Sequence, residues 1–448
     1  MDCIVLNTAR QTFPTVNLMG EFLLGFFSQP AVIAIYWAVV MLLVAVLASA
    51  VLIALHLVRK STEHIPDEIQ QILAGARDIK KGKDKKAVAG TSRFPQLANI
   101  DNELSETTEA EYDSATLMQL CEDFRNFAAS KLHLYYDIAD IRRFIGGMGI
   151  SKLIILRGIS GTGKTSLAYA AGEFFDNSST VVPIQPMWKE RSDMIGYFNE
   201  FTKKFNETTM LAKLYEAGGK DDLYITVLDE MNIARIEYYF AEFLSLLELP
   251  DASKRYLDVV ADSWPSDPVR LVNGRLLLPE NMWFIGTANN DDSTFAISDK
   301  VYDRAAVIDL DYKCAPFQAP ETKICHVSFE ELNRLYTEAK EKYKLSDECR
   351  TKLAKLDDYM SEVFRVSFGN RIMKQIETYI PIMMACGGEE VDALDDLLAR
   401  KILRKLEQLS PAFVRSEADG LLDLLDELFG EEHLAQSKDY VKRLKRTV

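Results

Sequence analysis

Hydrophobic and polar residues follow two different spacings along the C-terminal two-thirds of the chain. Between residues 135 and 311, short runs of apolar and β-branched residues alternate with helical stretches, which is typical of an α/β domain with a mainly parallel sheet. From Ser328 onward the spacing is helical, and Ser328 followed by Glu331 is typical of a helix N-terminus. We therefore expect an α/β domain over residues 114–315 and a helical lid with C-terminal helices over residues 316–448.

The N-terminal region contains a long apolar run. Residues 31–58 include no Asp, Glu, Lys or Arg, and the run exceeds the roughly 20 residues that cross a bilayer. A cleaved signal peptide would have a shorter core and a basic segment before it, and a buried core helix is rarely this apolar on every face. Basic residues begin at Arg59 and Lys60. The positive-inside rule then places a short segment, 1–30, outside the cytoplasm and the remainder of this single-pass membrane protein inside it.

The segment 59–113 is predicted to connect this span to the α/β domain. Residues 66–81 have the pattern of a short amphipathic helix, and basic residues at 80–86 suit either anionic lipid head groups or a solvated linker face. Residues 87–110 are rich in Thr, Ser, Asn and Glu and poor in large apolar residues, which predicts a flexible tether.

Composition narrows the possible functions. The formal net charge is −15, which disfavours a surface built for nonspecific nucleic-acid binding. The six cysteines show no CxxC spacing, and five would lie in the cytoplasm, where thiols stay reduced. We therefore expect neither a zinc site nor a disulfide framework.

The sequence GISGTGKT at residues 158–165 fits the phosphate-binding loop of nucleotide-binding proteins. An apolar run at 153–156 predicts a buried strand before it, and a helical stretch at 166–175 follows. Such a loop forms a ring of backbone N–H groups that binds polyphosphate, and the helix dipole adds to the attraction. Lys164 is expected to reach the β- and γ-phosphates, and the Thr165 hydroxyl to hold Mg²⁺. The predicted nucleotide contacts are Gly158, Ser160, Gly161, Thr162, Gly163, Lys164, Thr165 and Ser166.

Two further apolar runs end in polar residues that suit hydrolysis. The run at 223–228 ends in Asp229 and Glu230. We expect Asp229 to hold Mg²⁺ through its water shell and Glu230 to orient and deprotonate the attacking water. The run at 283–288 ends in Asn289, whose amide can hydrogen-bond the γ-phosphate and the water, although Asn at a strand end is ordinarily a turn former.

Two arginines are candidates for the cation that stabilises the developing charge. Arg304 fits an arginine supplied in trans if subunits form a ring, and its plainer interpretation is a surface salt bridge with Asp303. Arg371 would reach back to the phosphates from the helical part and report domain closure. Separately, Asn273 and Gly274 at the centre of residues 269–278 predict a hairpin with a type I′ turn.

The phosphate loop, the acidic strand end, the Asn-ending strand and the arginine-bearing helical lid together resemble an AAA+ ATPase. The sequences LDEMNIAR at 228–235, GTANNDDST at 286–294 and KVYDRA at 300–305 narrow the resemblance to the McrB-type branch, close to the dynein-related and MoxR-like group. That branch includes the motor subunit of modified-cytosine restriction systems.

The resemblance covers residues from about 135 to the C-terminus. It implies an oligomeric ring, commonly a hexamer, with nucleotide between neighbours. It further implies that Asp229 and Glu230 are the Mg²⁺ and water residues, that Asn289 is the first sensor, Arg304 the trans arginine finger and Arg371 the second sensor.

The resemblance leaves the nucleotide and the partner open. Asn289 followed by Asp292 is similar to the Asn-x-x-Asp signature of the GTP-using restriction motor, but Ala288 stands where that signature has Met. We therefore expect ATP, with GTP as the alternative.

Restriction motors of this type usually carry a DNA-reading domain where this chain has its apolar run. We therefore expect a nuclease or other effector as partner, and no direct nucleic-acid binding. The leading hypothesis is a membrane-anchored AAA+ NTPase that remodels or activates this partner in defence against foreign DNA. The alternatives are a MoxR-like chaperone for complex assembly or cofactor insertion, and a nucleotide-gated scaffold that does not hydrolyse.

Overall fold

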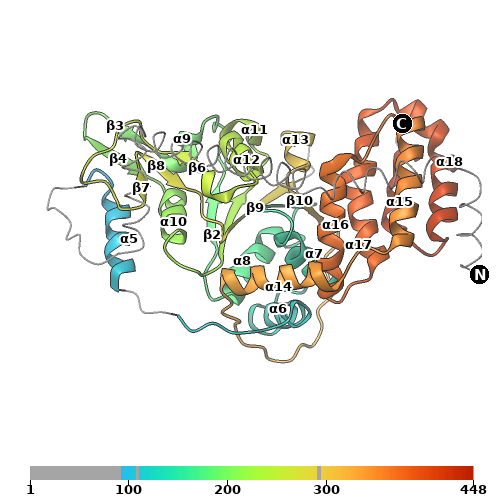
Figure 1. The fold of residues 1–448 in the computed structure, drawn as a ribbon, viewed down its shortest axis with the longest axis horizontal. Coiled ribbons are helices and arrows are strands. Elements are labelled where there is room, and N and C mark those ends of the chain that lie inside the picture. Colours follow the sequence, from blue (N-terminus) through green and yellow to red (C-terminus); the bar gives the residue numbers. More distant parts are fainter. Residues whose placement is uncertain (1–91, 107–109, 290–293, 447–448) are drawn as a thin grey trace, which may run out of the picture. The chain divides into compact units, whose positions relative to one another are not determined.

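The computed structural model describes residues 92–106, 110–289 and 294–446, which belong to one compact unit (Figure 1). The predicted N-terminal segment 1–30, the predicted membrane span 31–58 and the predicted amphipathic helix 66–81 lie outside these residues. Among the described residues, no helix has the length and the apolar content needed to cross a membrane.

The core of the described unit is a five-stranded parallel sheet in the order β10–β1–β9–β5–β2. The predicted alternation of strands and helices is confirmed, because each of the three short apolar runs named above, at 153–156, 223–228 and 283–288, forms one of these strands. The strands are β1 (Leu153–Gly158), β2 (Thr180–Pro183), β5 (Tyr224–Asp229), β9 (Met282–Asn289) and β10 (Ala306–Asp309). Since all neighbours are parallel, the carboxyl ends of the strands meet at one edge of the sheet.

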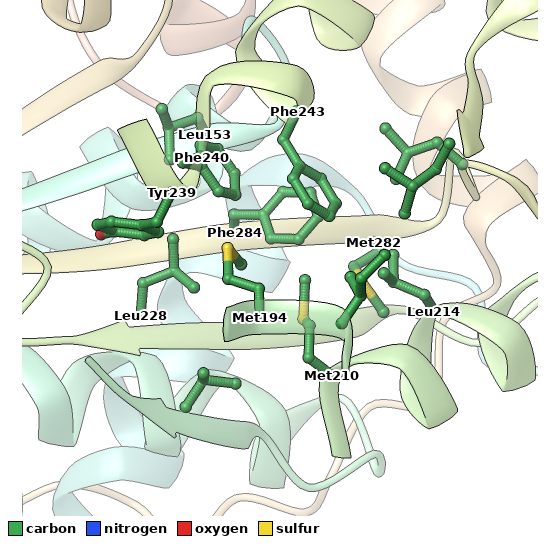
Figure 2. Close-up of a cluster of buried hydrophobic side chains, with 14 of the residues drawn as sticks. Leu153, Met194, Met210, Leu214, Leu228, Tyr239, Phe240, Phe243, Met282 and Phe284 are labelled. Carbon is green, nitrogen blue, oxygen red and sulfur yellow. The ribbon is translucent and has the colours of Figure 1, made fainter. Parts of the chain in front are cut away.

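Helices cover both faces of the sheet, so the central strands are apolar on both sides. The first face packs against α9 (Arg191–Ile195), α10 (Thr209–Ala217), α11 (Ile236–Tyr239) and α12 (Ala241–Glu248). Figure 2 shows this cluster around Phe284 of β9. Phe240 and Phe243 stack with their ring centroids 4.9 Å apart, and Phe284 meets both edge-on. The second face packs against α6 (Leu117–Leu132), α7 (Ile138–Met148) and α8 (Lys164–Phe174).

Two antiparallel additions interrupt this α/β frame. The strands β3 (Gly196–Asn199) and β4 (Lys204–Glu207) form a hairpin between α9 and α10. The strands β6 (Tyr256–Asp258), β7 (Leu271–Val272) and β8 (Arg275–Leu277) form a small sheet before β9. Asn273 and Gly274 have φ values of 53° and 74° between β7 and β8, so the predicted hairpin is confirmed.

The C-terminal part is helical, as predicted. After the short helix α13 (Asp299–Tyr302) and β10, the first helix of this part packs into the core of the second face of the sheet, and the helices from residue 347 onward have their own hydrophobic core. Ser328 caps that first helix by accepting a hydrogen bond from the backbone N–H of Glu331 at 3.0 Å. A π-helical turn at Leu398–Ile402 carries two buried basic residues, Arg400 and Lys401. The helices are α14 (Phe329–Lys342), α15 (Asp347–Tyr359), α16 (Gly369–Ala385), α17 (Glu390–Leu397), α18 (Pro411–Phe429) and α19 (Ala435–Arg446).

The prediction of a flexible tether is wrong for part of residues 87–110. Residues Pro95–Glu106 form helix α5, and Phe94 and Leu97 are fully buried against the core of the first face. Arg93 forms a two-bond ion pair with Asp267 at 2.8 Å and lies 4.3 Å from the centre of the Trp264 ring. The polar composition of this segment predicted a flexible tether. The prediction failed because the residues that α5 packs against lie far along the chain, and no local sequence pattern indicates them.

Candidate nucleotide-binding and hydrolysis site

The phosphate-loop sequence joins the end of β1 to the start of α8. Gly158, Gly161 and Gly163 have φ values of 152°, 85° and 92°, in the region that favours glycine. A Cβ atom at Gly158 would lie 2.3 Å from the carbonyl oxygen of Leu310. Glycine is therefore required at Gly158 both by the backbone conformation and by the close approach of β1 to the end of β10.

The N-terminus of α8 is suited to an anion. Its N-cap is Gly163, which contributes no side-chain hydrogen bond, so the first backbone N–H groups of the helix remain available to a phosphate. The Tyr136 hydroxyl donates to the carbonyl of Gly163 at 2.9 Å, and burial raises the pKa of Tyr136, so it stays a donor. The Lys164 ammonium donates to the carbonyls of Gly158 and Ile159 at 3.1 and 2.7 Å. The lysine thus lies along the inside of the loop, next to the helix start.

The acidic end of β5 lies against the phosphate loop. One oxygen of Asp229, Oδ1, accepts hydrogen bonds from the hydroxyls of Thr165 at 2.8 Å and Thr287 at 2.9 Å. The Thr287 hydroxyl in turn accepts the backbone N–H of Glu230 at 2.9 Å. Sequence reasoning missed Thr287, although it lies two residues before Asn289 in the strand that carried the resemblance. Thr287 bridges Asp229 and Glu230 because β9 lies beside β5, and a threonine in a strand does not by itself indicate such a role.

Asn289 and Glu230 are also in contact. The Asn289 amide donates to both carboxylate oxygens of Glu230, at 2.9 and 3.0 Å. Glu230 has a φ of 55°, which costs a non-glycine residue roughly 1–2 kcal/mol and turns its side chain toward β9. The backbone N–H of Met231 bonds to the carbonyl of Thr287 at 2.8 Å and fixes this turn. The structure therefore brings together Lys164, Thr165, Asp229, Glu230 and Asn289 at one edge of the sheet.

The residues at this edge fit Mg²⁺ bound together with a nucleotide. Mg²⁺ is usually held by one or two carboxylates with phosphate oxygens and waters, without an all-protein cage. Thr165 and Asp229 supply two oxygen ligands in direct contact with each other. Over the described ranges, no group of three or more His, Cys, Asp or Glu side chains is arranged to hold a metal ion. The donor set thus suits a metal whose remaining ligands come from the substrate.

Arg304 and Arg371 lie at the other end of the sheet. Both form ion pairs with Glu248, the last residue of α12. The alternative expectation for Arg304, a surface salt bridge with Asp303, is therefore wrong, because its partner is Glu248. The two arginines and Glu248 line a recess of about 430 Å³ that also includes Lys152 and Leu153, at the amino end of β1. The phosphate loop begins at the opposite end of this strand, roughly 17 Å away at about 3.3 Å per residue. The expectation that Arg371 reaches back to the phosphates of its own subunit is therefore wrong for this arrangement.

The sheet and its loop define the class of the fold. A parallel sheet with a phosphate loop after β1, acidic residues at the carboxyl end of β5 and helices on both faces is a fold of the P-loop NTPase type.

Comparisons with known proteins add little to this. A family model described as "Domain of unknown function (DUF8727)" matches residues 325–448, which include α14 to α19. The comparison with curated proteins gave no match. A solved structure of a full-length MCM homolog from Methanopyrus kandleri aligns with a TM-score of 0.33 and 9% identity over 70% of this chain. The alignment spans 61% of that protein, and a similarity of this degree carries no argument about function.

Proposed function

We propose that the protein is a Mg²⁺-dependent nucleoside triphosphatase of the AAA+ class that hydrolyses ATP, with GTP as the alternative substrate. One observation carries the proposal: Thr165, Asp229, Glu230 and Asn289 form a continuous hydrogen-bonded set, with Thr287 as its bridge. The strand order supports it, because β9 lies between β1 and β5 and so places Asn289 between the phosphate loop and the acidic pair.

Each residue of the set has a chemical task. The N–H groups at the start of α8 and the Lys164 ammonium bind the phosphates. Thr165 and Asp229 would hold Mg²⁺, which neutralises charge on the β- and γ-phosphate oxygens. Glu230 takes a proton from the attacking water. The Asn289 amide donates to both oxygens of the Glu230 carboxylate and so fixes its orientation. A fixed base orients the water along the line of attack.

The cation that stabilises the transferred phosphoryl group comes from a second copy of the chain. Arg304 and Arg371 lie at the amino end of β1, away from the phosphate loop of their own subunit. In a ring, that face of one subunit meets the nucleotide of the next. The resemblance to AAA+ proteins implies this arrangement for Arg304, and the proposal extends it to Arg371 because both arginines pair with Glu248. The proposed unit of activity is therefore a homo-oligomeric ring, with a hexamer as the expected form.

The cellular role in this proposal follows the McrB-type motifs described above. Hydrolysis remodels or activates a partner protein, such as a nuclease, and residues 31–58 anchor the ring to a membrane.

The test of hydrolysis uses the full-length protein in detergent and the substitution Glu230→Gln. The variant is expected to lose Mg²⁺-dependent hydrolysis by at least about a hundredfold while still binding nucleotide, because it keeps the shape of the side chain and loses the base. Lys164→Ala is the contrasting variant and is expected to lose nucleotide binding. Wild-type protein that hydrolyses neither ATP nor GTP would refute the proposal. Proteins that co-purify with Glu230→Gln from native membranes, in excess over wild type, identify the partner.

A further inference from the structure

Two arginines from separate elements converge on one carboxylate at the amino end of the sheet. Arg304 follows α13 and donates to Oε2 of Glu248, while Arg371 lies in the first turn of α16 and donates to Oε1. Each arginine therefore occupies one carboxylate oxygen. The hydrogen bond from Arg304 and the charge of both arginines lower the pKa of Glu248, so the carboxylate stays ionised.

The backbone that carries Arg304 is fixed, whereas the two arginine side chains reach the surface. The Ser151 hydroxyl donates to the carbonyl of Arg304 at 2.7 Å, and the buried Lys401 ammonium donates to the carbonyls of Tyr302 and Ala305. The side chains of Arg304 and Arg371 are 25% and 54% exposed, and that of Glu248 is 30% exposed. An incoming anion can therefore reach the guanidinium groups without any change in the backbone.

The recess around these residues is basic. Its cations are Arg255, Arg304, Arg371 and Lys374, with the buried Lys152 behind them, and its anions are Glu248, Glu280 and Asp303. Of the three anions, Glu248 is the one bonded to both arginines. If its charge is displaced, the recess presents a stronger positive field to the surface and attracts an anion more strongly.

We propose that Glu248 is an internal substitute for the terminal phosphate of a triphosphate bound by a neighbouring copy of this chain. It holds Arg304 and Arg371 in a subunit without such a neighbour, and the neighbour's nucleotide displaces it when the two copies meet. This inference rests on the proposed function, because it requires that the two arginines act in trans.

The strengths of the two interactions favour the exchange. An exposed ion pair changes an equilibrium constant by only about twofold to fivefold, since solvent screens it and the side chains lose freedom. A terminal phosphate carries more charge and offers three acceptor oxygens, which suits two guanidinium forks at once. The carboxylate therefore competes with the phosphate without blocking it, and it raises the nucleotide concentration at which copies assemble.

The test is Glu248→Gln in the full-length protein in detergent, titrated with ATP in the presence of Mg²⁺. The variant keeps the shape of the side chain and loses its charge. We expect the ATP concentration for half-maximal assembly, measured by mass photometry, to fall about threefold to tenfold, with a matching fall in the apparent KM. The control is Glu242→Gln on the same helix, which removes an ion pair with Arg191 at 2.8 Å and is expected to behave as wild type.

The possible outcomes separate this inference from the proposed function. Wild-type protein that neither hydrolyses nor assembles with ATP or GTP refutes both. If the wild type does both, an unchanged or raised half-maximal concentration in Glu248→Gln refutes the exchange, because Glu248 then only positions the arginines. An equal fall in Glu242→Gln also refutes it, since any loss of negative charge would have the same effect.

Discussion

The bridging role of Thr287 gives the sharpest prediction of how the site works. Its buried hydroxyl donates to Asp229 and accepts the backbone N–H of Glu230, so one atom sets the relative position of the metal ligand and the base. Thr287→Val keeps the shape of the side chain and removes this hydroxyl. The change leaves the Glu230 N–H and one hydrogen-bonding position on Asp229 without their partner.

The expected size of the effect follows from these two hydrogen bonds. A hydrogen bond to a charged group contributes about 1.5–3 kcal/mol, and one between neutral groups about 0.5–1.5 kcal/mol. Because both hold groups that act in the transition state, we expect a loss of about 2–3 kcal/mol of transition-state stabilisation. At 1.36 kcal/mol per factor of ten, kcat falls roughly 30- to 150-fold. The measurement is steady-state ATP hydrolysis at saturating Mg²⁺ and nucleotide, with thermal unfolding as a check on the fold.

A matched control lies one strand away. Thr226 of β5 is 1% exposed, and within the described residues its hydroxyl has no hydrogen-bond partner. Thr226→Val therefore removes a buried, unsatisfied polar atom and is expected to leave hydrolysis unchanged and stability equal or higher. The reasoning fails if Thr287→Val stays within about twofold of the wild-type rate, or if Thr226→Val loses as much activity as Thr287→Val.

Two further predictions concern stability. Phe94 is fully buried and stacks on Phe205 with ring centroids 4.9 Å apart. Phe94→Ala should therefore lower the free energy of unfolding, measured by denaturant titration, by about 3–5 kcal/mol. A loss below about 0.5 kcal/mol would contradict the packing of α5. Burial beside Trp283 and Phe329 lowers the pKa of Lys152 to about 7. Between about pH 7 and pH 10 the unfolded chain therefore binds a proton at this lysine that the folded protein does not bind. The free energy of unfolding of the wild-type protein should rise with pH across this window, by at most about 1.4 kcal/mol per pH unit. Lys152→Met should be more stable than wild type at pH 7 and lose most of that advantage by pH 10; an advantage that is equal at both pH values argues against the buried charge.

Much of the fold was predictable because its signals are local. The apolar runs that form β1, β5 and β9 are short and bounded by turn residues, and sheets with helices on both faces need strands of this kind. The hairpin turn at Asn273 and Gly274 was predictable for a similar reason, since few residues accept two successive positive φ values.

The site was predictable only in part. Asp229, Glu230 and Asn289 each end or follow an apolar run, Lys164 belongs to the phosphate-loop sequence after another such run, and parallel strands bring these ends to one edge. Thr287 has no signal of this kind. Thr287 contacts Asp229 and Glu230 because β9 lies beside β5, and the order of strands in a sheet cannot be predicted from any short stretch of sequence.

The sequence by itself determined the elements, the phosphate loop and the residue types available for hydrolysis, because backbone propensity and apolar periodicity act over a few neighbouring residues. Only the tertiary structure decided which side chains meet. The pairing of Arg304 and Arg371 with Glu248 joins residues 56 and 123 positions apart, and the anchoring of α5 through Arg93 and Asp267 joins residues 174 apart. Such contacts depend on how the strands are ordered and on which surfaces can bury their apolar area together, and these are properties of the whole folded unit.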